Sequence, residues 1–197
     1  MKYLRDIESD KIIRFILGTS VILLVFSFIL PFPIVLFVQD MLFFSYDHLL
    51  FIRPRLAYSG MTIGMIVIAL AMLSFLATKI LSEKGDKVYR WTLPHLIVFV
   101  FGFVLMGLAL NHYYFLEEGR VVENGFFSFS EEEVSLSEVV ELRREVKKEN
   151  YEVISYTFDR GDKELKIPYD SRDPDASQAI YYLIDLYEWE LEDVFIE

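Results

Sequence analysis

The 197-residue chain contains no cysteine. This absence excludes disulfide bonds, thiolate metal sites and cysteine nucleophiles. The sequence also lacks the Gly-Lys-Ser/Thr phosphate loop, the dinucleotide fingerprint, the Gly-x-Ser-x-Gly elbow and the zinc-binding helix signature. We therefore expect a protein that is not an enzyme, with no catalytic residues, no cofactor and no bound metal.

Charged residues are missing from three long stretches, residues 15–38, 56–78 and 91–116. A bilayer core about 30 Å thick requires roughly 20 apolar helical residues. A single charge at the centre of such a helix costs about 3 kcal/mol. The three stretches predict three transmembrane helices in a multi-pass protein of the plasma membrane, with the lipid bilayer as its first partner.

Pro31 and Pro33 lie inside the first stretch and should bend or end its helix, because proline removes a backbone donor. Residues 41–52 are then expected to lie in the membrane interface as an amphipathic helix, with Asp47 and His48 turned to water. The apolar face of that helix would comprise Leu42, Phe43, Tyr46, Leu49 and Leu50. Four spans are the alternative, with residues 34–52 as the second, at the cost of burying Asp40, Asp47 and His48.

Basic residues near the span ends predict the orientation. The leader at residues 1–14 carries Lys2, Arg5, Lys11 and Arg14, and the first loop carries Arg53 and Arg55. The second loop carries Lys79, Lys84, Lys87 and Arg90, and only Arg120 closely follows the third span. Cytoplasmic loops carry the excess of Lys and Arg. The N-terminus and second loop are expected in the cytoplasm, and the C-terminal domain outside.

The last part of the chain, residues 117–197, is expected to form a separate, water-soluble domain. After His112 the sequence has 9 Lys and Arg against 23 Asp and Glu, a net charge of -14, whereas the part up to His112 has a net charge of +3. So acidic a domain repels phosphate backbones, which excludes nucleic acid as a partner. A protein partner, basic in character, is favoured; homo-oligomerisation is left open.

Period-two patterns in this domain predict antiparallel strands. Asn124-Gly125 predicts a tight hairpin between Val121-Val122 and Phe126 to Phe129, and residues 151–158 and 165–169 predict a second hairpin. Asp173-Pro174 is typical of a helix start. Apolar residues follow at helical spacing, namely Ile180, Leu183, Ile184, Tyr187 and Leu191. The fold class is thus three membrane helices plus an α+β domain of antiparallel strands closed by a C-terminal amphipathic helix.

This element order resembles the bacterial pleckstrin-homology-like (PH-like) domains that are attached to small membrane proteins. The resemblance covers residues 113–197 and rests on 116–121 (Leu-Glu-Glu-Gly-Arg-Val), on 124–127 (Asn-Gly-Phe-Phe), on 135–140 (Ser-Leu-Ser-Glu-Val-Val) and on the terminal helix. It implies a PH-like fold and a binding or scaffolding role, with no catalytic residues to transfer. Such domains commonly face the cytoplasm, whereas the charge pattern here points outward.

Few residues qualify as functional-site candidates. The histidines His48, His95 and His112 lack metal-ligand spacing, and with Asn111 they are interpreted as polar residues at the membrane interface. Gly60 and Gly64 form a small-x-x-x-small pattern that predicts close packing between helices of the chain rather than dimerisation.

Charged clusters have structural interpretations. The acidic cluster at 131–133 is taken as a solvated edge and Asp170, Asp173 and Asp175 as a helix cap, since neither follows the pattern of a calcium loop. The charged stretch 141–149 is expected to be an exposed, ion-paired segment, helical or irregular.

The preferred function is that of a non-enzymatic membrane protein that presents a small acidic PH-like domain to other proteins, as an accessory, immunity, envelope-stress or scaffolding factor. The alternative is a subunit of a transporter or other membrane complex, in which the soluble domain is a cap. A membrane-bound hydrolase is the third possibility, and it would depend on His48, His95 and His112.

Overall fold

The computed structural model describes residues 2–85 and 89–196, with side chains described from Ile12 onward. The chain divides into two compact units. Unit 1 comprises residues 1–38 and 56–110, and unit 2 comprises residues 39–55 and 111–197. The basic side chains predicted at Lys2, Arg5, Lys11 and Lys87 lie outside the described residues.

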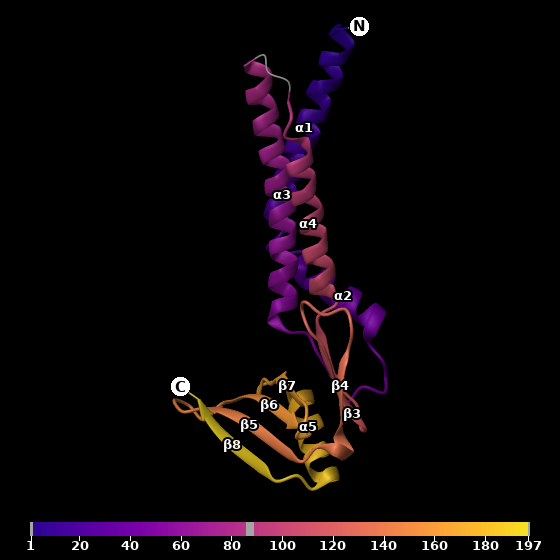
Figure 1. The fold of residues 1–197 in the computed structure, drawn as a ribbon, viewed down its shortest axis with the longest axis vertical. Helices are drawn as coiled ribbons and strands as arrows, with labels where there is room; N and C mark the ends of the chain where they lie inside the picture. Colours follow the sequence, from indigo (N-terminus) through magenta and orange to yellow (C-terminus); the bar gives the residue numbers. More distant parts are fainter. Residues whose placement is uncertain (1, 86–88, 197) are drawn as a thin grey trace. The chain divides into compact units, whose positions relative to one another are not determined.

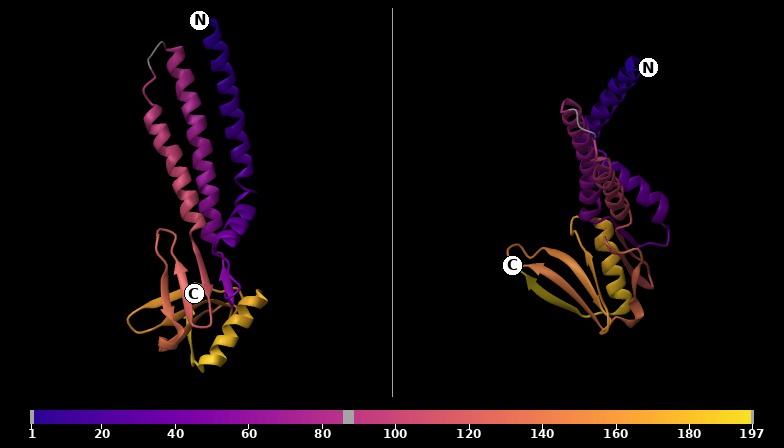
Figure 2. Two further views of the ribbon diagram at one scale, coloured as in Figure 1. Left: turned by 90° about the vertical axis from the view of Figure 1, so that its right-hand side faces the viewer. Right: turned by 45° about the horizontal axis from the view of Figure 1, so that its top comes forward.

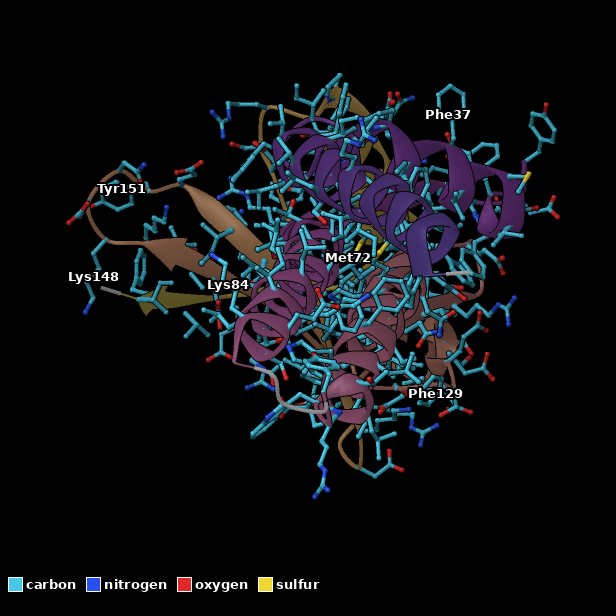
Figure 3. The ribbon with its side chains drawn as sticks, turned by 90° about the horizontal axis from the view of Figure 1, so that it is seen from above. Phe37, Met72, Lys84, Phe129, Lys148 and Tyr151 are labelled. Atoms are coloured by element: carbon cyan, nitrogen blue, oxygen red, sulfur yellow. The ribbon has the colours of Figure 1, made fainter. Side chains whose placement is uncertain are left out.

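Unit 1 is helical. It contains α1 (Lys2–Phe26), the first part of α2 (Pro31–Phe43), α3 (Arg55–Lys84) and α4 (Thr92–Leu110). Figure 1 and Figure 2 show α1, α3 and α4 running side by side, and Met72 of α3 lies among them in Figure 3. Two of the described helices, α3 and α4, are long and apolar enough to cross a membrane, and the number rises to three if α1 and α2 together form one broken span.

The proline-containing stretch breaks as its sequence predicts. α1 ends at Phe26, α2 begins at Pro31, and their axes differ by 80°. Pro31 occupies the first position of α2, where the missing N–H has no intrahelical partner to lose. The four-span alternative is wrong, because α2 ends at Phe43 and no helix covers residues 44–52.

The third predicted span is too long. α4 ends at Leu110, and Tyr113–Leu116 form strand β2 instead of the last turn of a helix. These four residues are aromatic or leucine, so their hydropathy suits a span as well as a buried strand. The boundary between apolar helices and the second unit therefore falls at Asn111 and not at residue 117.

Unit 2 contains two four-stranded sheets and a helix. The first sheet has the order β1 (Leu50–Ile52), β2 (Tyr113–Leu116), β3 (Arg120–Asn124), β4 (Glu132–Ser135), all antiparallel. The second has the order β7 (Glu164–Pro168), β6 (Val153–Asp159), β5 (Glu141–Lys147), β8 (Leu191–Ile196). In it β8 runs parallel to β5 and the other pairs are antiparallel. A short 3-10 turn (Leu136–Glu138) joins the sheets, and α5 (Pro174–Tyr187) precedes β8.

The core of unit 2 is formed by the inward faces of both sheets and by α5. Its fully buried members come from all three layers: Leu116, Val121, Val134, Leu136, Leu142, Tyr156, Phe158, Leu165, Ile167, Ile180 and Leu183. On the opposite face of the first sheet, Tyr113, Phe115 and Val122 form a smaller aromatic cluster with Phe43 and Phe51. Strands β1 and β2 are thus covered on both faces, which explains their continuous apolar sequences, Leu-Phe-Ile and Tyr-Tyr-Phe-Leu.

Residues 41–52 do not form the expected interfacial helix. α2 stops at Phe43, and Leu50–Ile52 form β1, which pairs with β2 through Leu50↔Leu116, Phe51↔Phe115 and Ile52↔Tyr114. Leu50 is buried in the main core while Phe51 joins the cluster on the other face. This alternation of faces belongs to a strand, and the helical spacing in the sequence was misleading.

Three expectations for the later part of unit 2 also need correction. The hairpin at Asn124-Gly125 joins β3 to β4 through a loop at 125–131, so Phe126, Phe127 and Phe129 lie in the loop and not in a strand. The charged stretch at 141–149 is mainly strand β5 and not a helical or irregular segment. The chain ends in strand β8 and not in the amphipathic helix, because α5 stops at Tyr187 with Glu188 in the left-handed conformation (φ 53°).

Candidate functional site

A groove in unit 2 lies between the edge strand β1 and helix α5. Its volume is about 690 Å³. One wall comes from the segment before α3 and the other from α5 and its cap: Phe44, His48, Leu49, Leu50, Phe51 and Arg53; Asp173, Asp175, Gln178, Ala179 and Tyr182. Pockets that bind ligands commonly have volumes of this order, with apolar walls and a few polar groups.

Helix α5 is fixed at both ends. The carboxylate of Asp173 accepts hydrogen bonds from the backbone N–H of Asp175 (3.0 Å) and of Ala176 (3.4 Å), as its position before Pro174 predicts. The hydroxyl of Tyr182 donates to the Glu118 carboxylate (2.9 Å). These bonds hold the groove-facing residues of α5 against the turn between β2 and β3.

The wall that contains β1 is held by polar contacts near the end of α2. Arg53 forms an ion pair with Asp40, and its guanidinium lies over the ring of Phe51 at 4.9 Å. The side-chain amide of Gln39 donates to the backbone oxygen of His112 (2.9 Å), and this bond is buried. The segment 39–55 is therefore an integral part of unit 2 and gives the groove a fixed wall.

His48 lies in this wall and is not turned to water, contrary to the expectation from sequence. Its side chain is 5% exposed and stacks on Phe115 with ring centroids 4.3 Å apart. Nδ1 accepts from the backbone N–H of Ser45 (3.2 Å), which leaves the proton of the neutral ring on Nε2, 3.5 Å from the Glu117 carboxylate. Burial lowers the pKa of His48 below its ordinary value, although Glu117 acts in the opposite direction.

Glu117 links His48 to a wider network. Its carboxylate pairs with Arg120 (2.7 Å), which also pairs with Glu133 (3.1 Å). The hydrogen bonds that the Arg120 guanidinium donates to both carboxylates raise the pKa of Arg120. The network ties the segment that carries His48 to β3 and β4.

Asn111 and His112 form the link between α4 and β2. His112 is buried, and its Nδ1 donates to the backbone oxygen of Asn124 (2.7 Å). Its ring also packs edge-on against Phe126, with centroids 5.8 Å apart. His112 thus stabilises the start of the first sheet, and it is a structural residue rather than a water-exposed polar one.

His95 belongs to unit 1 and joins α3 to α4. Its Nδ1 faces the Trp91 carbonyl (2.5 Å) and the Tyr89 hydroxyl (3.1 Å), while Nε2 faces the Ser74 hydroxyl (3.1 Å). With Nδ1 donating to the Trp91 carbonyl, Nε2 accepts a hydrogen bond from the Ser74 hydroxyl, as in a serine–histidine pair. The third partner is a carbonyl and not a carboxylate, however, so this cluster is better explained as an interhelical polar contact.

Gly64 and Gly102 mark the close crossing of α3 and α4. A Cβ atom added at Gly64 would lie 2.8 Å from the Gly102 carbonyl oxygen, and one at Gly102 would lie 2.9 Å from the Gly64 oxygen. Gly60 is also buried. The small-residue pattern of the sequence therefore coincides with packing inside unit 1, and its partner Gly102 had no signal of its own in the sequence.

The acidic clusters are occupied by internal contacts. Glu131 accepts from the Tyr113 hydroxyl (2.6 Å), Glu132 pairs with Lys163 (3.3 Å), and Glu133 pairs with Arg120. Among the described residues, no group of three or more His, Asp or Glu side chains is placed to hold a metal ion.

The structure does not bring together the six residues singled out from the sequence. His48, Asn111 and His112 belong to unit 2, whereas His95, Gly60 and Gly64 belong to unit 1. The sequence does not predict Gln178 and Tyr182 as groove residues. They line the groove only because α5 lies beside β1, which is more than 120 positions earlier in the chain. No family model, no curated protein and no solved structure matches this chain, and its PH-like classification therefore stays a prediction.

Proposed function

We propose that this chain is a non-enzymatic, multi-pass protein of the plasma membrane whose second unit binds a protein partner. Helices α3 and α4, with α1 and α2 as one broken span, anchor it in the bilayer. The length of α3 and α4 and the long uncharged stretches within them, residues 56–78 and 92–110, support this anchoring. Unit 2 supplies the recognition surface.

The groove between β1 and α5 is the observation that carries the proposal. β1 is the edge strand of its sheet, and a strand edge beside a groove of about 690 Å³ suits an extended peptide segment. Such a segment pairs with the strand through its backbone, while its side chains enter the groove. Phe44 and Phe51 offer apolar contacts there, and Asp175 and Gln178 offer polar ones.

Charge favours a basic partner. Unit 2 carries 11 Lys and Arg against 25 Asp and Glu, a net charge of -14. A field of that sign attracts cationic protein segments and repels nucleic acid. Asp173 and Asp175 at the groove place part of this charge beside the bound segment.

The PH-like classification and the outward orientation of unit 2 belong to the same proposal. Two four-stranded sheets with one helix support the first. The basic residues in the last turns of α3 and in the connection to α4, namely Lys79, Lys84 and Arg90, support the second. Protease added to intact cells should remove unit 2, and complete protection would contradict the orientation.

Photocrosslinking tests the binding role. A p-benzoylphenylalanine at Gln178, inside the groove, should give a discrete protein adduct in native membranes. The same group at Tyr151, which is 75% exposed and lies outside the groove, should not. Asp175→Lys should weaken the adduct, whereas Asp185→Lys, on the same helix but outside the groove, should leave it unchanged. Equal labelling from Gln178 and Tyr151 would refute the groove as a binding site.

A transporter or complex subunit is the second candidate, and the polar cluster in unit 1 favours it. Ser74, Thr78 and His95 line a cavity of about 490 Å³ in the apolar unit, and polar groups at membrane depth often mark a binding path. Exchanging the helices for an unrelated anchor of the same topology separates the candidates. Retained adduct formation from Gln178 would favour the groove, and loss of the adduct with unit 2 still folded would favour the helices.

A further inference from the structure

The loop between β3 and β4 carries an exposed aromatic tip. The side chains of Phe127 and Phe129 are 81% and 84% exposed. Residues 125–130 read Gly-Phe-Phe-Ser-Phe-Ser and contain no charge. Exposing two phenylalanine side chains to water is unfavourable, and exposed apolar patches mark sites of contact with proteins or membranes.

This tip is held in a defined shape. The backbone N–H of Ser128 donates to the Gly125 oxygen (2.9 Å), and the Ser128 hydroxyl donates to the Ser130 oxygen (2.7 Å). Phe126 packs edge-on against both His112 and Phe127. The loop is therefore anchored by Phe126, and its backbone is held in a defined turn from which Phe127 and Phe129 project.

Chain connectivity places the loop close to the end of α4. Tyr113, the first residue of β2, pairs with Asn124, the last residue of β3 before the loop. Tyr113 follows Leu110, the last residue of α4, by three positions, and three residues span at most about 11 Å. His112, which contacts Phe126, lies within this link. If α4 crosses the bilayer, the loop begins within the polar interfacial layer or at its edge.

Neighbouring acidic side chains do not prevent contact with lipid. The Tyr113 hydroxyl donates to Glu131, and burial raises the pKa of Tyr113 to about 12, so this donor keeps its proton. Glu132 and Glu133 are paired with Lys163 and Arg120. The tip itself is neutral, which suits the lipid acyl region better than a cationic or anionic protein surface.

We propose that Phe127 and Phe129 insert into the same bilayer that α4 crosses, and that the β3–β4 loop docks unit 2 on the lipid surface. The partner is the acyl-chain region of the lipid, reached by apolar contact rather than by charge. This inference rests on the proposed function, because it requires α4 to span the membrane.

Single-cysteine labelling of the full chain tests the proposal, since no native thiol competes. Phe127→Cys, Phe129→Cys, Val104→Cys and Tyr151→Cys are each labelled with bimane and reconstituted in phosphatidylcholine vesicles, with or without brominated phosphatidylcholine. Val104 is a half-exposed residue of α4, and Tyr151 is an exposed residue of unit 2. Figure 3 shows Tyr151 and Phe129 well apart in unit 2.

The two phenylalanine positions should lose fluorescence to brominated lipid as Val104 does, and they should be protected from acrylamide. Tyr151 should behave in the opposite way. Quenching at Val104 with Phe127 and Phe129 behaving like Tyr151 would overturn loop insertion and leave the membrane anchor intact. Absence of lipid quenching at Val104 would refute the spanning helix itself, and the inference with it. Fluorescence of Trp189, which is partly buried and packs against the core of unit 2, verifies that each variant is folded.

Discussion

The crossing of α3 and α4 gives the sharpest quantitative prediction. An alanine Cβ at Gly64 would lie 2.8 Å from the backbone oxygen of Gly102, whereas ordinary contacts begin at 3.4 Å. The same Cβ would lie 2.6 Å from Cγ of Met106. The Met106 side chain can rotate away, but the backbone oxygen cannot, so the two helices must move apart at this point. In Gly102→Ala the added Cβ would likewise lie 2.9 Å from the backbone oxygen of Gly64.

Gly107→Ala is the matched control, because a Cβ at Gly107 on α4 has no neighbour within 4 Å. Alanine is better than glycine in a helix by about 1 kcal/mol, and this gain is common to all three variants. Overpacking costs about 1–3 kcal/mol, and only Gly64→Ala and Gly102→Ala incur it. These two variants should therefore be less stable than Gly107→Ala by about 1–3 kcal/mol.

The measurement is reversible unfolding of the purified full chain in mixed micelles, with rising sodium dodecyl sulfate and far-ultraviolet circular dichroism as the signal. Gly107→Ala should unfold at the same or a higher detergent fraction than the parent protein. If Gly64→Ala and Gly102→Ala unfold together with Gly107→Ala, the two helices do not approach each other at these glycines and the crossing is wrong.

Three further predictions concern unit 2. Phe158→Ala should destabilise it by about 3–5 kcal/mol, since the fully buried ring leaves a cavity; Trp189, which packs on Phe158, reports the loss in a urea titration of its fluorescence. His48 has a lowered pKa in the folded state, so the unfolded chain binds a proton first and stability should fall as the pH drops below about 6.5. His48→Gln should reduce that slope between pH 7.5 and 5, and an unchanged slope would remove His48 from the pH response. Asp173→Ala should cost about 1 kcal/mol through loss of the helix cap, whereas Asp185→Ala should cost less in the same titration.

The sequence predicts elements whose signals are local. The uncharged stretches gave α3 and α4 because a charge inside a span is costly, and Asp173-Pro174 gave the start of α5 because capping needs only neighbouring residues. Alternation predicted the β6–β7 hairpin for the same reason. These features would be found in any chain that carried these segments.

Features that depend on distant partners were missed. Leu50 and Phe51 form a strand only because Leu116 and Phe115 lie beside them, more than 60 positions later. Leu191 fits the helical spacing of α5, yet it begins β8, where Asp193 pairs with Arg144 of β5. The helical spacing of residues 41–52 predicts His48 in water, whereas the ring that covers His48 belongs to Phe115, more than 60 positions later.

Strand β1 is separated in the chain from its partner β2 by the two long apolar helices α3 and α4. In the chain β1 comes first, then α3 and α4, and only afterwards β2, with which β1 pairs. If α3 and α4 each cross the bilayer, β1 and β2 meet only when both have done so and the chain has returned to its original side. If only one of the two helices crossed, β1 and β2 would lie on opposite sides of the membrane. Leu116 would then lack its partner Leu50, and the groove would lack one wall. Under the proposed topology, the groove beside β1 would therefore form only after both helices have been inserted correctly.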